Sequence, residues 1–195
     1  MQKFTDRQIE IMEAATNIIS EFGIQNLTIK TLAKNIKLSE PALYRHFKSK
    51  NQILWSLLEY FKTEIENRIQ SIPFETSTSE ADKLKAIFNS QLQTFVNKPA
   101  IVSVVFAENI FHYEKNLSNK VSEIMNMIQD YVKNNIKQGQ ENGEYNKLMG
   151  ASTLTTILIG GIRMTVLKWK LSEYKSDLIK DGGTVLDGIL KMIVK

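Results

Sequence analysis

Apolar residues recur at helical spacing along the whole chain, and the alternation that marks β-strands is missing. The pattern predicts an all-α fold with a three-helix N-terminal domain, a connecting helix over about 49–71 and a C-terminal bundle of about five helices. Pro99, Gly143 and the Gly182-Gly183 pair divide the second half. The predicted segments there are 79–97, 100–113, 118–141, 147–171 and 177–194.

The first helix is predicted to begin at Thr5, whose hydroxyl can form a capping box with Gln8, and to end at Gly23. Its apolar positions form one stripe, and the connecting helix carries a matching stripe. The two stripes are Ile11, Ala15, Ile18, Ile19 and Phe22 in the first helix, and Ile53, Leu54, Leu57, Leu58 and Phe61 in the connecting helix.

Residues 27–50 predict two short helices joined by a tight turn. Thr28 is placed to cap the first of them. Apolar residues recur at helical spacing in that helix and form one face, which consists of Ile29, Leu32, Ala33 and Ile36.

The second short helix begins at Ser39, a good N-cap residue, with Pro41 in the first turn, where the missing N–H is tolerated. Leu38 is expected to be a buried plug between the two helices, while Leu43 and Phe47 anchor the second helix inward. This arrangement is typical of a helix-turn-helix that reads DNA.

The charge of this segment supports the same interpretation. Residues 27–50 carry six basic residues and only Glu40 as an acid, a net charge of +5, whereas the whole chain is +4, so the other residues sum to about −1. Such a segment attracts phosphates through counterion release. The alternative is that an ordinary three-helix unit simply has a solvated basic face.

The runs Thr28-Ile-Lys-x-Leu-Ala and Leu38-Ser-x-Pro-Ala-Leu-Tyr-x-His-Phe-Lys-x-Lys50 resemble the N-terminal domain of the TetR/AcrR transcriptional regulators, most densely over residues 5–58. Beyond about residue 75 the resemblance is only in length and helical character. The family usually has glycine before the plug, where this chain has Lys37. A non-glycine residue is therefore expected at positive φ, at a cost of about 1 kcal/mol.

The resemblance implies a set of DNA-contacting residues. Lys30 and Glu40 are expected to read base edges, and Ala42 to meet a thymine methyl, although Glu40 could instead only favour the helix dipole. Phosphate contacts are expected from Thr28, Tyr44, His46 and Lys50. The full predicted set is Thr28, Lys30, Ser39, Glu40, Pro41, Ala42, Tyr44, Arg45, His46, Lys48 and Lys50.

Length and composition fit one compact regulator with two domains. The predicted boundaries are 1–50 for the helix-turn-helix domain and 75–195 for a ligand-binding and dimerisation domain. The chain has no cysteine, and its N-terminal residues lack the apolar stretch of a signal peptide, so a cytoplasmic location is expected. The longest uncharged stretch, residues 148–162, is too short to span a membrane, and no membrane partner is expected.

A homodimer is expected because one short recognition helix contacts few base pairs, and specificity normally needs two half-sites. The last two helices are predicted to form a four-helix bundle with their symmetry mates, as in family members. The alternative is that both helices only fill the core of one chain. The predicted interface consists of Ala151, Thr155, Leu158, Ile162, Val185, Ile189 and Met192.

The C-terminal domain is also expected to hold a pocket for a small apolar effector of unknown identity. Large apolar residues at helical spacing are more often plain core, so polar residues among them, such as Gln91 and Arg163, are the better candidates for orienting a ligand. The predicted lining is Phe88, Gln91, Leu92, Phe95, Phe106, Asn109, Ile110, Tyr113, Met125, Ile128, Arg163 and Trp169.

An enzyme is the competing class, and the sequence gives it little support. The chain has two histidines, no cysteine, no glycine-rich phosphate loop and no acidic cluster with metal spacing, so no catalytic residue, metal site or cofactor is predicted. The preferred prediction is a homodimeric repressor that an effector releases from a palindromic operator in double-stranded DNA. The alternative is a DNA-binding protein of the same fold that answers to a protein partner or has an architectural role.

Overall fold

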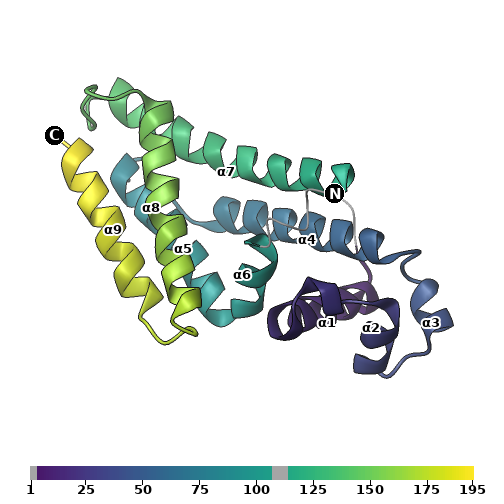
Figure 1. Ribbon diagram of the computed structural model, residues 1–195. Coiled ribbons are helices and arrows are strands. Elements are labelled where there is room, and N and C mark those ends of the chain that lie inside the picture. Colours follow the sequence, from purple (N-terminus) through teal and green to yellow (C-terminus); the bar gives the residue numbers. More distant parts are fainter. Residues whose placement is uncertain (1–3, 107–113) are drawn as a thin grey trace. The chain divides into compact units, whose positions relative to one another are not determined.

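The computed structural model describes residues 4–106 and 114–195. These residues contain helices and no β-strand, and one isolated antiparallel bridge joins Tyr145 to Val194, so the all-α prediction is confirmed. The elements are α1 (Asp6–Phe22), η1 (Ile24–Asn26), α2 (Ile29–Asn35), α3 (Glu40–Tyr44), α4 (Lys50–Ser71), α5 (Glu80–Asn97), α6 (Pro99–Val105), α7 (Lys115–Glu141), α8 (Ala151–Leu171) and α9 (Leu178–Ile193) (Figure 1).

Side-chain caps confirm the three predicted helix starts near the N-terminus. The Thr5 hydroxyl accepts from the Gln8 backbone N–H at 3.2 Å, and the Gln8 side chain accepts from the Thr5 N–H at 3.1 Å. Thr28 and Thr31 exchange the same kind of bonds, at 3.0 and 2.9 Å. Ser39 accepts from the backbone N–H three residues further on at 3.3 Å. Each bond satisfies an amide at a helix start that has no partner within its helix.

In the second half, the predicted breaks at Pro99 and Gly143 are confirmed, since α5 ends at Asn97, α6 begins at Pro99, and Gly143 lies between α7 and α8. α6 stops at Val105, and residues 107–113 of the predicted segment lie outside the described residues. The third predicted break is wrong. The Gly182-Gly183 pair lies within α9 and does not interrupt it. The chain instead turns just before α9, where Glu173 and Tyr174 have positive φ values of 55° and 64°.

Contacts between α-carbons divide the chain into two compact units. The first contains Met1–Glu66 and Lys98–Glu123, and the second contains Asn67–Asn97 and Ile124–Lys195. Two continuous helices, α4 and α7, therefore contribute residues to both units. The functional domain boundaries predicted from the sequence stay a prediction, because packing alone does not assign function.

The core of the first unit is formed by the predicted stripes of α1 and α4, which are buried with one exception. Phe22, expected on the inner face of α1, has a side chain that is 53% exposed. It is the last residue of its helix, where the chain leaves the packed layer at Gly23. α1 also packs against α6, whose Val102 is fully buried.

The core of the second unit lies between α5, α8 and α9, and α9 packs against both of the others. α5 approaches α9 closely at Gly182. A Cβ at this position would lie only 2.4 Å from Leu92 Cδ1, so the close approach requires glycine. Trp169 and Tyr174 close one end of α8 with their rings edge to face, 4.7 Å apart between centroids. No helix in the described ranges is long and apolar enough to cross a membrane.

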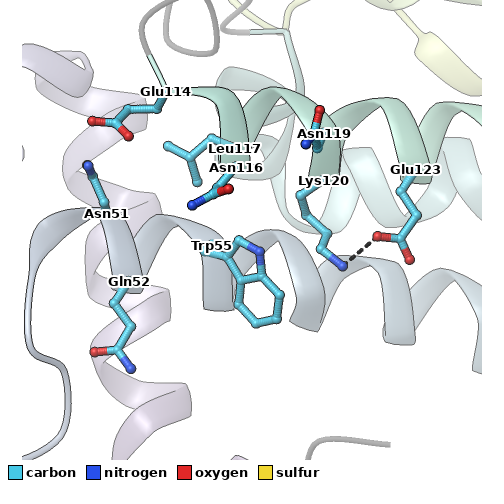
Figure 2. A pocket seen from close by; sticks show the side chains of 9 residues that line it. All are labelled: Asn51, Gln52, Trp55, Glu114, Asn116, Leu117, Asn119, Lys120 and Glu123. Carbon is cyan, nitrogen blue, oxygen red and sulfur yellow. Dashed lines mark hydrogen bonds and ion pairs between the residues drawn. The ribbon is translucent and has the colours of Figure 1, made fainter.

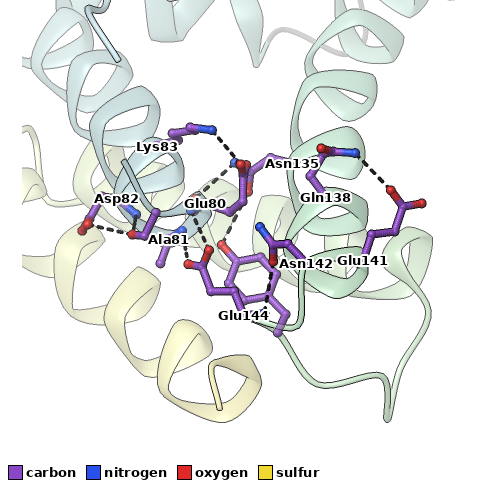
Figure 3. A network of polar contacts seen from close by, with 11 residues as sticks. Glu80, Ala81, Asp82, Lys83, Asn135, Gln138, Glu141, Asn142 and Glu144 are labelled. Atoms are coloured by element: carbon purple, nitrogen blue, oxygen red, sulfur yellow. Dashed lines mark hydrogen bonds and ion pairs between the residues drawn. The ribbon is translucent and has the colours of Figure 1, made fainter. Parts of the chain in front are cut away.

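A polar network ties the start of α5 to the end of α7 in the second unit (Figure 3). The Glu144 carboxylate accepts from the backbone N–H groups of Glu80 and Ala81, at 2.8 and 2.9 Å. The Asn135 amide donates to the Glu80 carbonyl at 3.1 Å and to its carboxylate at 2.5 Å. Tyr145, fully buried beside this network, points its hydroxyl at Asn135 at 3.5 Å. The carboxylate thus caps a helix from a distant part of the chain.

Candidate nucleic-acid interface

The turn between α2 and α3 has the geometry that the sequence predicts. Lys37 takes a positive φ of 54°, and its backbone N–H donates to the Lys34 carbonyl at 3.3 Å. The Leu38 N–H donates to the Ala33 carbonyl at 2.9 Å, which closes the end of α2. Leu38 itself is half-buried rather than the buried plug expected.

Leu43 and Phe47 anchor α3 as predicted, and both are essentially fully buried. Their burial fixes which side of this short helix faces outward. Tyr44 lies on that side with 49% of its surface exposed, and Arg45 and Glu40 are also exposed. The helix therefore presents a ring and charges of both signs to the solvent.

The predicted DNA-contacting residues share one region of the first unit, and most of them are exposed. The exposed members are Thr28, Lys30, Ser39, Glu40, Pro41, Tyr44, Arg45 and Lys48, and the half-buried members are Ala42, His46 and Lys50. Thr28 and Ser39 already use their hydroxyls as helix caps. Whether any of these residues contacts DNA stays a prediction.

Lys50 has a structural role that the sequence did not indicate. Its ammonium donates to the Ile24 carbonyl at 2.9 Å, which fastens η1 to the start of α4. Burial lowers the pKa of Lys50. An ammonium carries three donors, so this bond leaves two for a phosphate.

Sequence reasoning also missed the side-chain cap at the start of α4. The Ser49 hydroxyl accepts from the Gln52 N–H at 3.1 Å, and the Gln52 side chain accepts from the Lys48 N–H, one residue before the cap, at 2.6 Å. The signal was present, since Ser-x-x-Gln before an apolar run is a pattern of helix starts. The second bond fixes the backbone that carries the Lys48 side chain.

The electrostatic character of this surface is strongly positive. Lys30, Lys34, Lys37, Arg45 and Lys48 are all exposed, and no ion pair within residues 4–106 and 114–195 engages any of them. These charges are therefore available to a polyanion. No cluster of metal-binding side chains occurs among the described residues either.

The residues predicted to line an effector pocket are only partly brought together. Phe88, Leu92, Phe95 and Trp169 are buried in the second unit, where the Gln91 side chain accepts a hydrogen bond from Arg68. Phe106 belongs to the first unit. Ile128 and Arg163 are half-buried and Met125 is 45% exposed, while Asn109, Ile110 and Tyr113 lie outside the described residues. The predicted pocket stays untested.

The face predicted for dimerisation is largely turned into the chain itself. Thr155, Leu158, Ile162 and Ile189 are buried within one chain, and Val185 packs with Ile189 against Gly161 of α8. Ala151 is half-buried, and only Met192 is well exposed. These residues are covered within one chain because α8 and α9 pack against each other, and whether any of them contacts a second chain stays a prediction. The exposed apolar residues of these helices are Ile157, Met164, Leu171 and Met192.

The fold and this surface together define a class of protein, a DNA-binding regulator that carries a helix-turn-helix on a helical body. Two family models match the chain. The one described as "Bacterial regulatory proteins, tetR family" matches residues 11–57, and the one described as "YsiA-like protein, C-terminal region" matches residues 58–192. The chain belongs to the TetR family of transcriptional regulators.

Individual relatives agree with this assignment. The nucleoid occlusion factor SlmA of Marinomonas sp. (strain MWYL1) is 25% identical over 89% of this chain and 87% of its own length. The solved structure of the fatty acid degradation regulator FadR from Bacillus halodurans has a TM-score of 0.86 at 20% identity, over 97% of both chains. FadR from Bacillus subtilis in complex with stearoyl-CoA has a TM-score of 0.77 at 21% identity, over 93% of this chain and 97% of that one. These structural similarities show the fold.

Proposed function

We propose that this protein is a homodimeric transcriptional repressor that binds a palindromic operator and is released from it by a small apolar effector. The observation that carries the proposal is the set of exposed, unpaired basic side chains around a firmly anchored α3. Phosphates attract such a surface at any sequence, and the outward residues of α3 supply groups that can distinguish bases.

We assign different roles to two pairs of residues. Lys30 and Glu40, at the exposed starts of α2 and α3, read base edges, whereas Tyr44 and Lys48 contact the DNA backbone. Replacing Tyr44 or Lys48 with alanine is expected to weaken binding to every sequence. Replacing Lys30 or Glu40 is expected to change which sequence is preferred. Equal losses on all sequences from all four variants would contradict this division.

A dimer would place two α3 helices in successive major grooves, roughly 34–36 Å apart. We propose that the exposed faces of α8 and α9 form its interface, because large apolar side chains are exposed there, namely Ile157 and Met164 on α8 and Met192 on α9. Gly160 and Gly188 on the same helices have no described atom near the position of a Cβ, so a second chain could approach closely. Replacing Met164 with aspartate is expected to give a monomer, by light scattering.

A fatty acyl thioester is the effector class that we would test first. A regulator of this fold from Bacillus subtilis was solved with stearoyl-CoA, and the second unit of this chain buries aromatic side chains at Phe88, Phe95 and Trp169 that suit an acyl chain. The effector would favour a conformation in which the two α3 helices no longer match the operator. A preference of a few kcal/mol between the two states changes affinity about 10²-fold.

A second candidate function is control by a protein partner, or an architectural role, without a small effector. The similarity to a nucleoid occlusion factor at 25% identity over most of the chain favours keeping it. The two candidates differ in one observable, since only the repressor loses operator affinity when a small molecule is added.

The test is selection of bound duplexes from a random pool, followed by affinity for the winner at several salt concentrations. A palindromic winner with a steep salt slope supports the dimeric repressor. Stearoyl-CoA is then titrated against free coenzyme A as control. Loss of affinity with stearoyl-CoA alone supports the acyl effector, and unchanged affinity at saturation rejects it. No enrichment of any sequence would contradict the operator.

A further inference from the structure

A cluster of charges joins α4 to the first turns of α7 inside the first unit. The Lys120 ammonium lies 2.7 Å from a carboxylate oxygen of Glu59 and 2.6 Å from one of Glu123. Glu123 also pairs with Lys62, which lies 3.8 Å from Glu66. Three of the five residues come from α4 and two from α7, and Glu59 is 61 positions away from Lys120. The cluster therefore connects two helices and is not formed only by neighbouring residues of one helix.

Lys120 is the most enclosed member of this cluster. Its ammonium lies 4.8 Å from the centroid of the Trp55 ring, in the position of a cation–π contact (Figure 2). Its side chain is 11% exposed and that of Glu59 is 19% exposed. The Lys137–Glu141 pair, further along α7, is a contrast, because its side chains are 65% and 53% exposed. Desolvation makes the Lys120 contacts stronger than those of an open surface pair.

The charges in the cluster depend on one another. Burial lowers the pKa of Lys120, but hydrogen bonds to Glu123 and Glu59 outweigh it, so the pKa is raised overall. Hydrogen bonds from Lys120 and, next in size, from Lys62 lower the pKa of Glu123. Removing Lys120 would leave Glu59 without its cation, whereas Glu123 would keep Lys62. A largely buried charge without a partner is costly.

The cluster borders a groove of about 620 Å³ between the beginnings of α4 and α7, and Trp55, Asn116 and Glu123 line it (Figure 2). Solvent therefore reaches one side of the charges. Water and salt can therefore weaken these ion pairs while both helices stay folded. A fully enclosed ion pair is screened much less.

The position of the cluster on α4 connects it to the DNA-binding surface. Trp55 and Glu59 lie one to three turns after Lys50, which holds η1, and the Gln52 side chain holds the backbone of Lys48. The opposite side of the same turns, including Ile53 and Leu57, is buried in the core that supports α1 to α3. The start of α4 is thus held by apolar packing on one side and by α7 on the other.

We propose that Lys120 is a positioning residue for DNA binding. By joining Glu59 and Glu123 against Trp55, it fixes the first turns of α4 and, through them, the orientation of α3 and of Lys48 in the first unit. It touches no DNA itself. α7 also continues into the second unit, so a change in that helix has a path to the DNA-binding surface through this side chain. The inference needs only the DNA binding that family membership establishes.

The test compares Lys120→Met with Lys137→Met, which removes an exposed ion pair from the same helix. Lys120→Met is expected to lower affinity for the selected duplex about tenfold, while affinity for random duplex changes less than about twofold. Lys137→Met is expected to change neither. Lys120→Arg should restore most of the affinity, because a guanidinium can also bridge two carboxylates. Equal losses on selected and random DNA would overturn the positioning role.

A variant that folds poorly would lower both affinities, so a second measurement is needed. Glu59→Gln combined with Lys120→Met removes the isolated carboxylate, and the double variant is expected to bind and melt better than Lys120→Met alone. Quenching of Trp55 fluorescence by acrylamide, with Trp55→Phe to report the background of Trp169, should increase in Lys120→Met. Unchanged quenching would overturn the proposal, and this readout does not depend on an operator having been found.

Discussion

Each of the two units contains a polar network that connects helices of that unit, and the two networks are of different kinds. In the first unit, α4 and α7 are connected by charged side chains, with Lys120 between Glu59 and Glu123 and solvent on one side. In the second unit, the carboxylate of Glu144 binds backbone amides at the start of α5, next to fully buried Tyr145. One network pairs charges, and the other satisfies amides that a helix cannot satisfy by itself.

This difference indicates which region can change and which cannot. Side-chain ion pairs can separate while both helices stay intact, and their strength depends on salt. A capped helix end cannot be released without leaving buried amides unpaired, which costs about 1–3 kcal/mol per group. We therefore expect the charge cluster of the first unit to respond to salt, and the Glu144 network of the second unit to act as a fixed framework at the start of α5.

The largest effect is expected from disturbing the fixed framework at Gly139. A Cβ there would lie 2.3 and 2.4 Å from ring atoms of Tyr145, a side chain with no exposed surface into which it could move. Gly139→Ala is expected to lower the free energy of unfolding by about 3 kcal/mol, measured by chemical denaturation. Gly183→Ala is the control, because no described atom lies within 4 Å of its Cβ position. It should stabilise α9 by about 0.5–1 kcal/mol. Similar losses in both variants would contradict the close approach.

An intermediate effect is expected from alkaline pH. Burial, followed by the charges of Glu144, Glu80 and Asp82, raises the pKa of Tyr145 far above its usual value of 10.0. The neutral phenol is thus favoured in the folded state. The buried neutral phenol therefore contributes fully to the free energy of unfolding below about pH 10. This contribution is lost as the pH rises further, because Tyr145 ionises more readily in the unfolded chain than in the folded one.

Tyr145→Phe should reduce this alkaline loss of stability, followed as melting temperature against pH. Its own cost at neutral pH is expected to stay below about 1 kcal/mol, since the hydroxyl makes only a long bond of 3.5 Å. Some dependence of the melting temperature on pH will remain in this variant. Burial also raises the pKa of Tyr60, and paired lysines such as Lys62 titrate in the same range. Identical pH profiles for the variant and the wild-type protein would rule out Tyr145 as the source.

The smallest effect is expected from salt on the charge cluster. Raising the salt concentration to about 1 M shortens the Debye length to about 3 Å and should weaken the pairs of Lys62 with Glu123 and Glu66. The expected loss is below about 1 kcal/mol, because Glu123 is 45% exposed. It should appear as increased hydrogen exchange in α4 but not at the start of α5. Lys62→Met should show less of this salt dependence, and exchange that rises equally in both helices would contradict the comparison.

Much of the N-terminal half could be predicted from the sequence because its signals are local. A cap such as Thr28 or Ser39 acts within three residues, and the positive φ of Lys37 follows from its place in a short turn. The cap of Gln52 by Ser49 is equally local, since it also acts within three residues. The outcome in the second half was different. Periodicity shows that α8 has an apolar stripe but not what covers it, and only the structure shows that Leu158 of this stripe is buried within one chain.

The sequence by itself determined the helical class, the starts of α1 to α3, the turn of the helix-turn-helix and the concentration of positive charge there, since each depends on residues a few positions apart. Only the tertiary structure decided that Lys120 meets Glu59, that Gly182 makes room for Leu92 and that Glu144 caps α5. These contacts join residues that lie far apart in the sequence. No local pattern specifies such a pairing, because it depends on how whole helices pack.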